Sequence, residues 1–286
     1  GLVGEGSFQA NNILSDMSVD GGSGEYLGGV VGKAGTNTVL TNCIMKGTIR
    51  ASETNSVGGV SGYGGHLTNC YVSGNIEGKT WVGGLMGYLP GTDCSVKDCQ
   101  VAATYGEGNV DILDYIMDDT PILRKSPLDV KGNTAVGGYF GYAELTGSNC
   151  SGKLVLDWVP ENKAMISGTS SVGGFAGSCG LTGEIQNLSF ESNVKVQGKE
   201  RVGGFVGRLD GKHKKHDIYI LINGPVVGDD GGQYIGGIVG YGSGLIENCV
   251  NNIPVTGTGT DAGGIAGQFS GKIRYCKNTA AITGVK

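Results

Sequence analysis

Charged residues and proline are both scarce in this chain. Asp, Glu, Lys and Arg make up 16% of the 286 residues, against about 25% in an ordinary globular protein, and there are only six prolines. The formal net charge of −5 gives no electrostatic reason to expect nucleic acid as a partner. Hydrophobic residues still account for 38%, which is too many for a disordered chain.

Several functional motifs are also missing from the sequence. No apolar run approaches the ~18 residues of a membrane-spanning helix, so we expect no membrane insertion in this segment. No signal peptide, phosphate-binding loop, G-x-S-x-G elbow or H-E-x-x-H zinc motif occurs. The histidines are His66, His213 and His216; we interpret "HKKH" at 213–216 as a solvated turn, because a metal site needs three or four converging ligands. We expect no metal and no cofactor.

Glycine is the residue present in excess, at 57 of 286 residues. It marks a repeated hexad of two glycines, two variable residues and a third glycine, preceded by an apolar residue. The full copies are LGGVVG (27–32), VGGVSG (57–62), VGGLMG (82–87), VGGYFG (136–141), VGGFAG (172–177), VGGFVG (202–207), IGGIVG (235–240) and AGGIAG (262–267). The chain opens on GLVG, the last four positions of the same hexad, so nine copies are visible and the chain begins inside a repeat.

A second landmark follows each hexad. Asparagine or aspartate precedes a cysteine or an aliphatic residue in nearly every copy: Asn12-Ile13, Asn42-Cys43, Asn69-Cys70, Asp98-Cys99, Asn149-Cys150, Asn187-Leu188, Asp217-Ile218 and Asn248-Cys249, with Tyr275-Cys276 in the last copy. Each repeat thus carries three short apolar stretches separated by turn residues, without helical spacing. We predict an all-β fold, a parallel β-solenoid of about nine rungs with three short strands each, forming a single domain over 1–286 that is part of a longer chain.

The repeat also predicts individual roles. The glycine pair is expected to adopt positive φ at a corner and to let neighbouring rungs approach closely. The residue after the pair is large in every copy and is expected to form the main core row, whereas the following position varies and is expected to be less buried. Residues 104–132 contain no hexad and are interpreted as an insertion, with a short helical turn around 110–119.

The GLVG opening, the GGφφG copies and strands such as LTNCYVSGNI resemble the GLUG-motif repeats of bacterial extracellular proteins. Such repeats occur in adhesin-like surface proteins and beside the catalytic domains of secreted immunoglobulin A peptidases. The resemblance implies an extracellular or bacterial cell-surface location and carries no catalytic residue with it.

We therefore expect a non-catalytic repeat scaffold, used for adhesion to a host or neighbouring-cell glycan or protein, or as a spacer that presents another domain. The alternative is a polysaccharide-active β-helix enzyme, a lyase or a glycosidase. That class needs clustered carboxylates or basic groups on one face, and no acidic pair recurs in register here. The incomplete first repeat also predicts that upstream residues complete the coil or that chains stack end to end.

One surface row is a candidate ligand site. The residue after each hexad reads Glu5, Lys33, Tyr63, Tyr88, Tyr142, Ser178, Arg208, Tyr241 and Gln268. Strand alternation should point this row outward, which would stack Tyr63, Tyr88 and Tyr142 on successive rungs. Tyr63, Tyr88, Tyr142 and Tyr241 are the predicted ligand-binding residues, because tyrosine is favoured at interfaces. The competing interpretation is that stacked tyrosines only stabilise the sheet.

The cysteines exchange with Leu and Ile at one register, which is typical of small buried hydrophobes. We therefore predict free thiols. Only Cys94 and Cys179 are expected to lie off this row.

Overall fold

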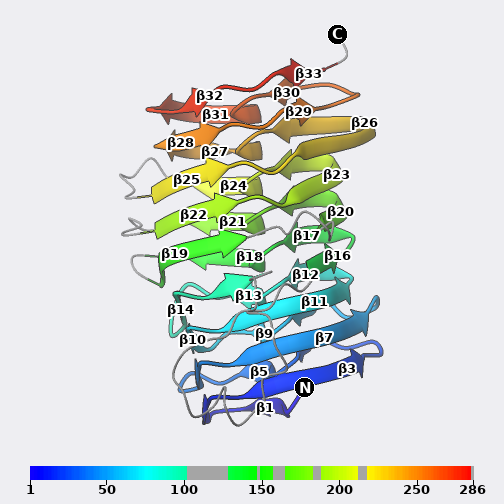
Figure 1. Ribbon diagram of the computed structural model, residues 1–286, viewed down its shortest axis with the longest axis vertical. Helices are drawn as coiled ribbons and strands as arrows, with labels where there is room; N and C mark the ends of the chain where they lie inside the picture. The colour runs from blue at the N-terminus through cyan, green and yellow to red at the C-terminus, as the bar shows by residue number, and fades with distance from the viewer. Residues whose placement is uncertain (102–127, 147–148, 157–164, 183–187, 212–217, 285–286) are drawn as a thin grey trace, which may run out of the picture.

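The computed structural model describes residues 1–101, 128–146, 149–156, 165–182, 188–211 and 218–284. Every strand pairing in it is parallel, and the strands stack into one β-solenoid of about eight turns (Figure 1). The described residues contain no helix, and therefore none that could cross a membrane. The all-β solenoid predicted from the repeats is confirmed.

One sheet runs the length of the solenoid and holds the strands that follow the hexads. These strands lie in the order β1 (Val3–Gly6), β5 (Val31–Ala34), β9 (Ser61–Tyr63), β13 (Met86–Leu89), β18 (Phe140–Leu145), β21 (Ala176–Leu181), β24 (Val206–Gly211), β27 (Val239–Glu247) and β31 (Ala266–Arg274). We call it the hexad sheet. Its nine strands correspond to the nine copies of the repeat.

The other strands complete the coils. Short strands follow the hexad sheet in the first coils: β2 (Gln9–Asn11), β6 (Val39–Thr41), β10 (His66–Thr68) and β14 (Ser95–Lys97). The strands that come next along the coils are β3 (Leu14–Asp20), β7 (Ile44–Ala51), β11 (Tyr71–Gly78), β15 (Gln100–Val101), β16 (Leu128–Lys131), β19 (Cys150–Leu156), β20 (Met165–Gly173), β22 (Leu188–Ser192), β23 (Lys195–Gly203), β25 (Ile218–Ile222), β26 (Val226–Gly236), β28 (Cys249–Asn251), β29 (Val255–Thr256), β32 (Lys277–Asn278) and β33 (Ile282–Thr283). Strands that lead into a hexad are β4 (Tyr26–Gly28), β8 (Ser56–Gly58), β12 (Thr80–Gly83), β17 (Thr134–Gly137) and β30 (Ala262–Gly263).

The number of strands per coil changes along the rod. The coil from β21 to β23 has three strands, as expected from the repeat, whereas the coil from β5 to β8 has four because its turns interrupt the strands more often.

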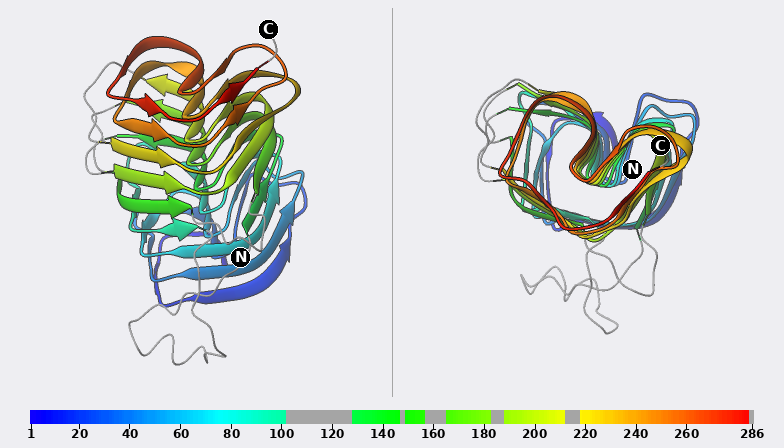
Figure 2. Two further views of the ribbon diagram at one scale, coloured as in Figure 1. Left: turned by 45° about the horizontal axis from the view of Figure 1, so that its top comes forward. Right: turned by 90° about the horizontal axis from the view of Figure 1, so that it is seen from above.

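Each coil folds back on itself at the hexad, which indents one side of its outline (Figure 2). The glycines allow this by close approach. A Cβ on Gly141 would lie 2.0 Å from the carbonyl carbon of Trp81 in the coil below, and a Cβ on Gly59 would lie 2.3 Å from the Gly84 carbonyl oxygen. The expectation of positive φ at the glycine pair is wrong, because no hexad glycine adopts it. The missing Cβ is needed for space rather than for backbone conformation.

Non-glycine residues make the corners instead. Asn12, Asn42, Asn69, Asp98 and Asn248 all have φ between 50° and 56°. Asparagine and aspartate tolerate this left-handed conformation better than other side chains. Their amides also pair across coils, since Asn42 Nδ2 donates to Asn12 Oδ1 at 3.0 Å and Asn69 Nδ2 donates to Asn42 Oδ1 at 2.9 Å. In these coils asparagine therefore both forms the corner and bonds to the asparagine of the neighbouring coil.

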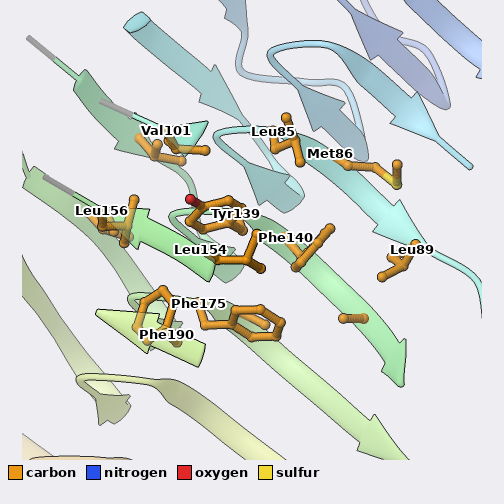
Figure 3. Close-up of a cluster of buried hydrophobic side chains, with 14 of the residues drawn as sticks. Leu85, Met86, Leu89, Val101, Tyr139, Phe140, Leu154, Leu156, Phe175 and Phe190 are labelled. Carbon is orange, nitrogen blue, oxygen red and sulfur yellow. The ribbon is translucent and has the colours of Figure 1, made fainter. Parts of the chain in front are cut away.

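The core is a continuous column of side chains inside the coils. The row after the glycine pair is buried through the inner coils: Val30, Val60, Leu85, Tyr139, Phe175, Phe205 and Ile238. Its aromatic members pack tightly, with Phe175 and Phe205 centroids 4.8 Å apart and Phe175 also against Phe190 (Figure 3). The next position is equally buried, at Ser61, Met86 and Phe140 among others, which corrects the expectation of lower burial.

The cysteine row holds for the first coils and shifts in the middle ones. Ile220 on β25 pairs with Cys249, and Phe190 pairs with Ile220, so this register contains Phe190 and Ile220 rather than Leu188 and Ile218. Cys150 pairs with Val96, one corner earlier in the coil. In the coil of β19 the left-handed corner beside Asp98 is Gly152, with φ of 87°, and not Asn149, so counting from the Asn-Cys dipeptide misplaces copies five to seven.

The interruption between repeats is shorter than predicted. Residues 128–131 form β16, which pairs with β11 from Gly74 to Glu77, so they belong to the solenoid and not to an insertion over 104–132. Val72 pairs with Val101 and Gly74 with Leu128, which places both ends of the interruption opposite Ser73. The helical turn expected around 110–119 lies outside the described residues.

Candidate functional site

The residues that follow the hexads form one row in register along the hexad sheet. Each is paired with the next, in the order Glu5, Lys33, Tyr63, Tyr88, Tyr142, Ser178, Arg208, Tyr241 and Gln268. None of the side chains in the row is fully buried, in contrast to the core rows. The row predicted from the sequence therefore exists as a physical line of side chains.

Three tyrosines in this row stack ring on ring. The centroids of Tyr63 and Tyr88 are 5.2 Å apart with planes 11° from parallel, and those of Tyr88 and Tyr142 are 5.1 Å apart with planes 14° from parallel. We call Tyr63, Tyr88 and Tyr142 the tyrosine ladder. The spacing slightly exceeds the ~4.8 Å between strands, so the coil repeat itself sets the stacking distance.

A second row of aromatic residues lies beside the ladder. Trp81 packs against Tyr88 edge to face at 5.3 Å and is 6.2 Å from Tyr142. Tyr26 meets Tyr63 edge to face at 5.2 Å. Trp81 occupies a corner with φ of 51°, an uncommon conformation for a bulky side chain, which aims it back toward the ladder. Together the two rows make an aromatic strip.

A hydrogen bond to Glu144 holds Tyr88, the central ring of the strip, in place. The Tyr88 hydroxyl donates to Glu144 Oε1 at 2.7 Å, and the backbone N–H of Gly91 donates to Glu144 Oε2 at 3.3 Å. Burial raises the pKa of Tyr88, and the bond to the Glu144 carboxylate raises that pKa further. Burial also raises the pKa of Tyr63 and of Tyr142. The ladder tyrosines are therefore neutral hydrogen-bond donors at neutral pH.

Tyr241 does not join the ladder. Ser178 and Arg208 separate it from Tyr142 in the row. Its ring instead packs against Tyr234 at 5.4 Å, and the Arg201 guanidinium lies 5.6 Å from its centroid. The four tyrosines predicted as one site are thus three stacked rings and one separate ring.

The interval between the ladder and Tyr241 is polar. Arg208 Nε lies 2.9 Å from Asp210 Oδ2, with 47% and 57% of the two side chains exposed. Arg201 Nη2 is paired with Glu200 Oε1 at 2.6 Å, and Arg201 Nη1 donates to the Ser170 hydroxyl at 3.2 Å. Both arginines are charge-compensated by a carboxylate of the same strand.

The second row of the strip was not predicted from the sequence. Tyr26, Trp81, Arg201 and Tyr234 all lie two residues before a glycine pair. A comparison of that position across the repeats would have found them, since Tyr26, Trp81 and Tyr234 each contact a tyrosine of the row after the hexad. Glu144 has no such signal, because its hydrogen bond depends on how Tyr88 leans toward the next coil.

The nucleophiles and candidate ligands lie elsewhere. Within the described ranges, no three His, Cys, Asp or Glu side chains converge as metal ligands would. His66 Nδ1 lies 3.0 Å from the Ser95 hydroxyl of the next coil, whereas His213 and His216 fall outside the described residues. All eight cysteines are free thiols, as predicted. Cys179 is buried in the core and Cys94 is half-buried, with its sulfur 3.3 Å from the Gly65 N–H.

Comparison with known proteins gives one similarity. No known family matches the chain, and no solved structure matches it. Over 196 aligned residues the chain is 28% identical to halomucin of Haloquadratum walsbyi (strain DSM 16790 / HBSQ001). The alignment covers 64% of this chain and 2% of halomucin.

Proposed function

We propose that this chain is a non-catalytic repeat scaffold of a bacterial cell-surface or secreted protein. The observation that carries the proposal is the in-register parallel stacking of nine strands in the hexad sheet over one contiguous core. Eight strand spacings of ~4.8 Å make a rod of about 40 Å. The first strand, β1, and the last, β33, lie at opposite ends of the long axis, so anything that adjoins them is held apart by that length (Figure 1).

Surface charges contribute to this role by joining coils rather than by forming a site. Lys33 pairs with Glu5, Lys46 with Asp16 and Lys79 with Glu53, each across a coil boundary and with the side chains exposed. Exposed pairs of this kind contribute little to stability, because solvent screens the charges. Similarity to a protein named halomucin supports the extracellular or surface location.

The scaffold proposal is tested with intact and permeabilised cells of the producing organism. An antibody against residues 1–286 should label intact cells or the culture medium. Labelling that appears only after permeabilisation would contradict the surface location. The enzymatic alternative is checked by incubating the protein with pectate, alginate and hyaluronate and following absorbance near 235 nm. Formation of unsaturated products would establish a lyase.

Adhesion is the second candidate, and the half-buried aromatic strip at the surface favours it. Its partner would be a glycan or protein of a host or of a neighbouring cell. Beads coated with the protein should then adhere to such cells more than beads coated with a chain lacking the strip. Equal adhesion by both would leave only the spacer role.

End-to-end association is a further proposal about partners. Leu2 at the first coil is 53% exposed, and Ile282 at the last is 46% exposed, although both positions are buried in inner coils. Light scattering over a range of protein concentrations should show growth beyond the monomer. A concentration-independent monomer would contradict stacking between copies.

A further inference from the structure

The tyrosine ladder ends with one uncovered ring face. Tyr142 stacks on Tyr88 at 5.1 Å, and the next member of the row on its other side is Ser178. Among the described residues, no ring stacks on that second face of Tyr142. The two faces of Tyr88, in contrast, are covered by Tyr63 and Tyr142. The ladder therefore presents ring edges along its length and a ring face only where it stops.

The coil beyond Tyr142 carries only small residues at the matching positions. Ser178 is half-buried and pairs with Tyr142, Gly180 is buried and pairs with Glu144, and we call Ser178 and Gly180 the ladder gap. A Cβ placed on Gly180 would lie 3.5 Å from the Tyr142 hydroxyl, so the phenol leans over a residue without a side chain. Ser178 therefore places only a hydroxymethyl group at the row position that a tyrosine holds in the three preceding coils.

Charged side chains bound the gap on its far side. Arg208 pairs with Ser178 in register, and Asp210 pairs with Gly180. The guanidinium of Arg208 is held by the Asp210 carboxylate at 2.9 Å. Both side chains are about half exposed, so their remaining hydrogen-bonding capacity is open to solvent.

The dimensions of the gap match one ring. Tyr142 and Arg208 lie two coils apart, or about 9.6 Å at ~4.8 Å per strand spacing. Rings in the ladder are 5.1–5.2 Å apart. One further ring placed over Ser178 would therefore contact Tyr142 on one side and reach the Arg208–Asp210 pair on the other.

We propose that the ladder gap binds a single neutral hexopyranose ring. The face of Tyr142 is the negative side of an aromatic quadrupole, which suits the partly positive C–H bonds on one face of a pyranose. Arg208 donates to ring hydroxyl oxygens, Asp210 accepts from hydroxyl groups, and Ser178 does both. Because Arg208 and Asp210 already neutralise each other, a neutral sugar is favoured over a uronic acid or an amine.

A peptide aromatic side chain fits this position less well. An aromatic side chain would stack equally well on Tyr142. Its edge, however, carries no hydrogen-bonding groups for Ser178, Arg208 and Asp210. Desolvating that ion pair against a hydrocarbon edge is unfavourable. This proposal rests on the adhesion candidate and narrows its partner to glycans. The scaffold role is independent of it.

The test is saturation-transfer difference NMR on the complete 286-residue chain. The probes are the methyl glycosides of glucose, galactose and mannose, with methyl glucuronide and N-acetyltyrosinamide as competitors of other chemistry. We expect transfer to the C–H protons of at least one neutral glycoside, with millimolar affinity. Methyl glucuronide and N-acetyltyrosinamide should give weaker transfer than that glycoside.

Four variants locate the binding. Tyr142→Ala and Ser178→Tyr should each weaken binding by at least about tenfold, the first by removing the platform and the second by filling the gap with a fourth ring. Arg208→Gln should weaken it by a smaller factor. Tyr219→Ala, which removes an exposed tyrosine ring outside the strip, is the matched control and should bind like the natural chain. Circular dichroism and a thermal melt confirm that each variant is folded, and Ser178→Tyr should melt at or above the natural temperature.

The outcomes separate clearly. Absence of transfer to all three neutral glycosides in the folded natural chain would overturn the proposal. So would equal loss in Tyr219→Ala and Tyr142→Ala, because that would show that binding does not require the Tyr142 face. Preferential transfer to N-acetyltyrosinamide would show a peptide site instead. None of these results alters the surface-labelling test of the scaffold role.

Discussion

The side-chain amide of Asn69 donates a hydrogen bond to the side-chain oxygen of Asn42 at 2.9 Å, although 27 residues separate the two along the chain. Asn42 repeats the contact with Asn12 in the coil below, at 3.0 Å. Each of these residues also occupies a left-handed corner. A single asparagine therefore turns its own coil and binds the next one.

These two roles of Asn42 can be separated by substitution. Asn42→Gly retains the left-handed conformation and loses only the amide bonds, at about 1–2 kcal/mol of unfolding free energy. Asn42→Ala also places a Cβ in the left-handed region, which costs a further ~1–2 kcal/mol. Urea unfolding should rank stability as natural chain, then glycine variant, then alanine variant. Equal stability of the two variants would show that the corner conformation contributes nothing.

The hexad glycines should tolerate no side chain. In Gly141→Ala the new Cβ would lie 2.0 Å from a backbone atom of Trp81, so a coil boundary must open. We expect a loss of at least about 3 kcal/mol, at the upper end for overpacking. Gly22→Ala is the control, because a Cβ there meets nothing within 4 Å, and its stability should change by less than about 1 kcal/mol. A thermal melt of both variants measures the difference.

The ladder should stabilise the solenoid apart from any ligand. Tyr88→Ala removes two stacking contacts and the bond to Glu144, and we expect it to cost about 2–3 kcal/mol. Tyr88→Phe keeps the stacking and loses only the hydroxyl, at about 1 kcal/mol. Tyr219→Ala, at a 49% exposed ring, should change stability by less than about 0.5 kcal/mol. If the Tyr88→Ala variant is as stable as the Tyr219→Ala variant, the ladder does not stabilise the solenoid.

Thiol reactivity should single out Cys276. A hydrogen bond from the Cys249 thiol lowers the pKa of Cys276 to about 7, and Cys276 is half-buried rather than enclosed. Because the thiolate is the reactive form, iodoacetamide should alkylate Cys276 in the native protein with a midpoint near pH 7. Burial raises the pKa of Cys179 and shields its sulfur, so Cys179 should react only after unfolding.

The control for this titration is Cys249→Ala. Loss of the donated hydrogen bond should move the reactivity midpoint of Cys276 to higher pH, because its thiolate is then less stabilised. An unchanged midpoint would assign the lowered pKa to the backbone N–H groups around Cys276 instead. Mass spectrometry of the alkylated peptides identifies the residue in both cases.

Self-similarity of the sequence by itself determined the architecture of this protein. Nine hexads force nine equivalent strands to stack, and the position after each hexad places Tyr63, Tyr88 and Tyr142 in one line. The asparagine corners follow from the same periodicity, because few other side chains accept a left-handed backbone.

Only the tertiary structure decided what each repeated position contacts. The hexad glycines are needed because another coil passes within van der Waals distance, and the sequence of one repeat does not show that approach. The register of Cys150, Phe190 and Ile220 follows the strand pairing and not the Asn-Cys dipeptide, because the corner after Cys150 lies at Gly152. Whether Tyr142 has a covered or an open ring face depends on Ser178, a residue 36 positions away that the coil repeat brings to its side.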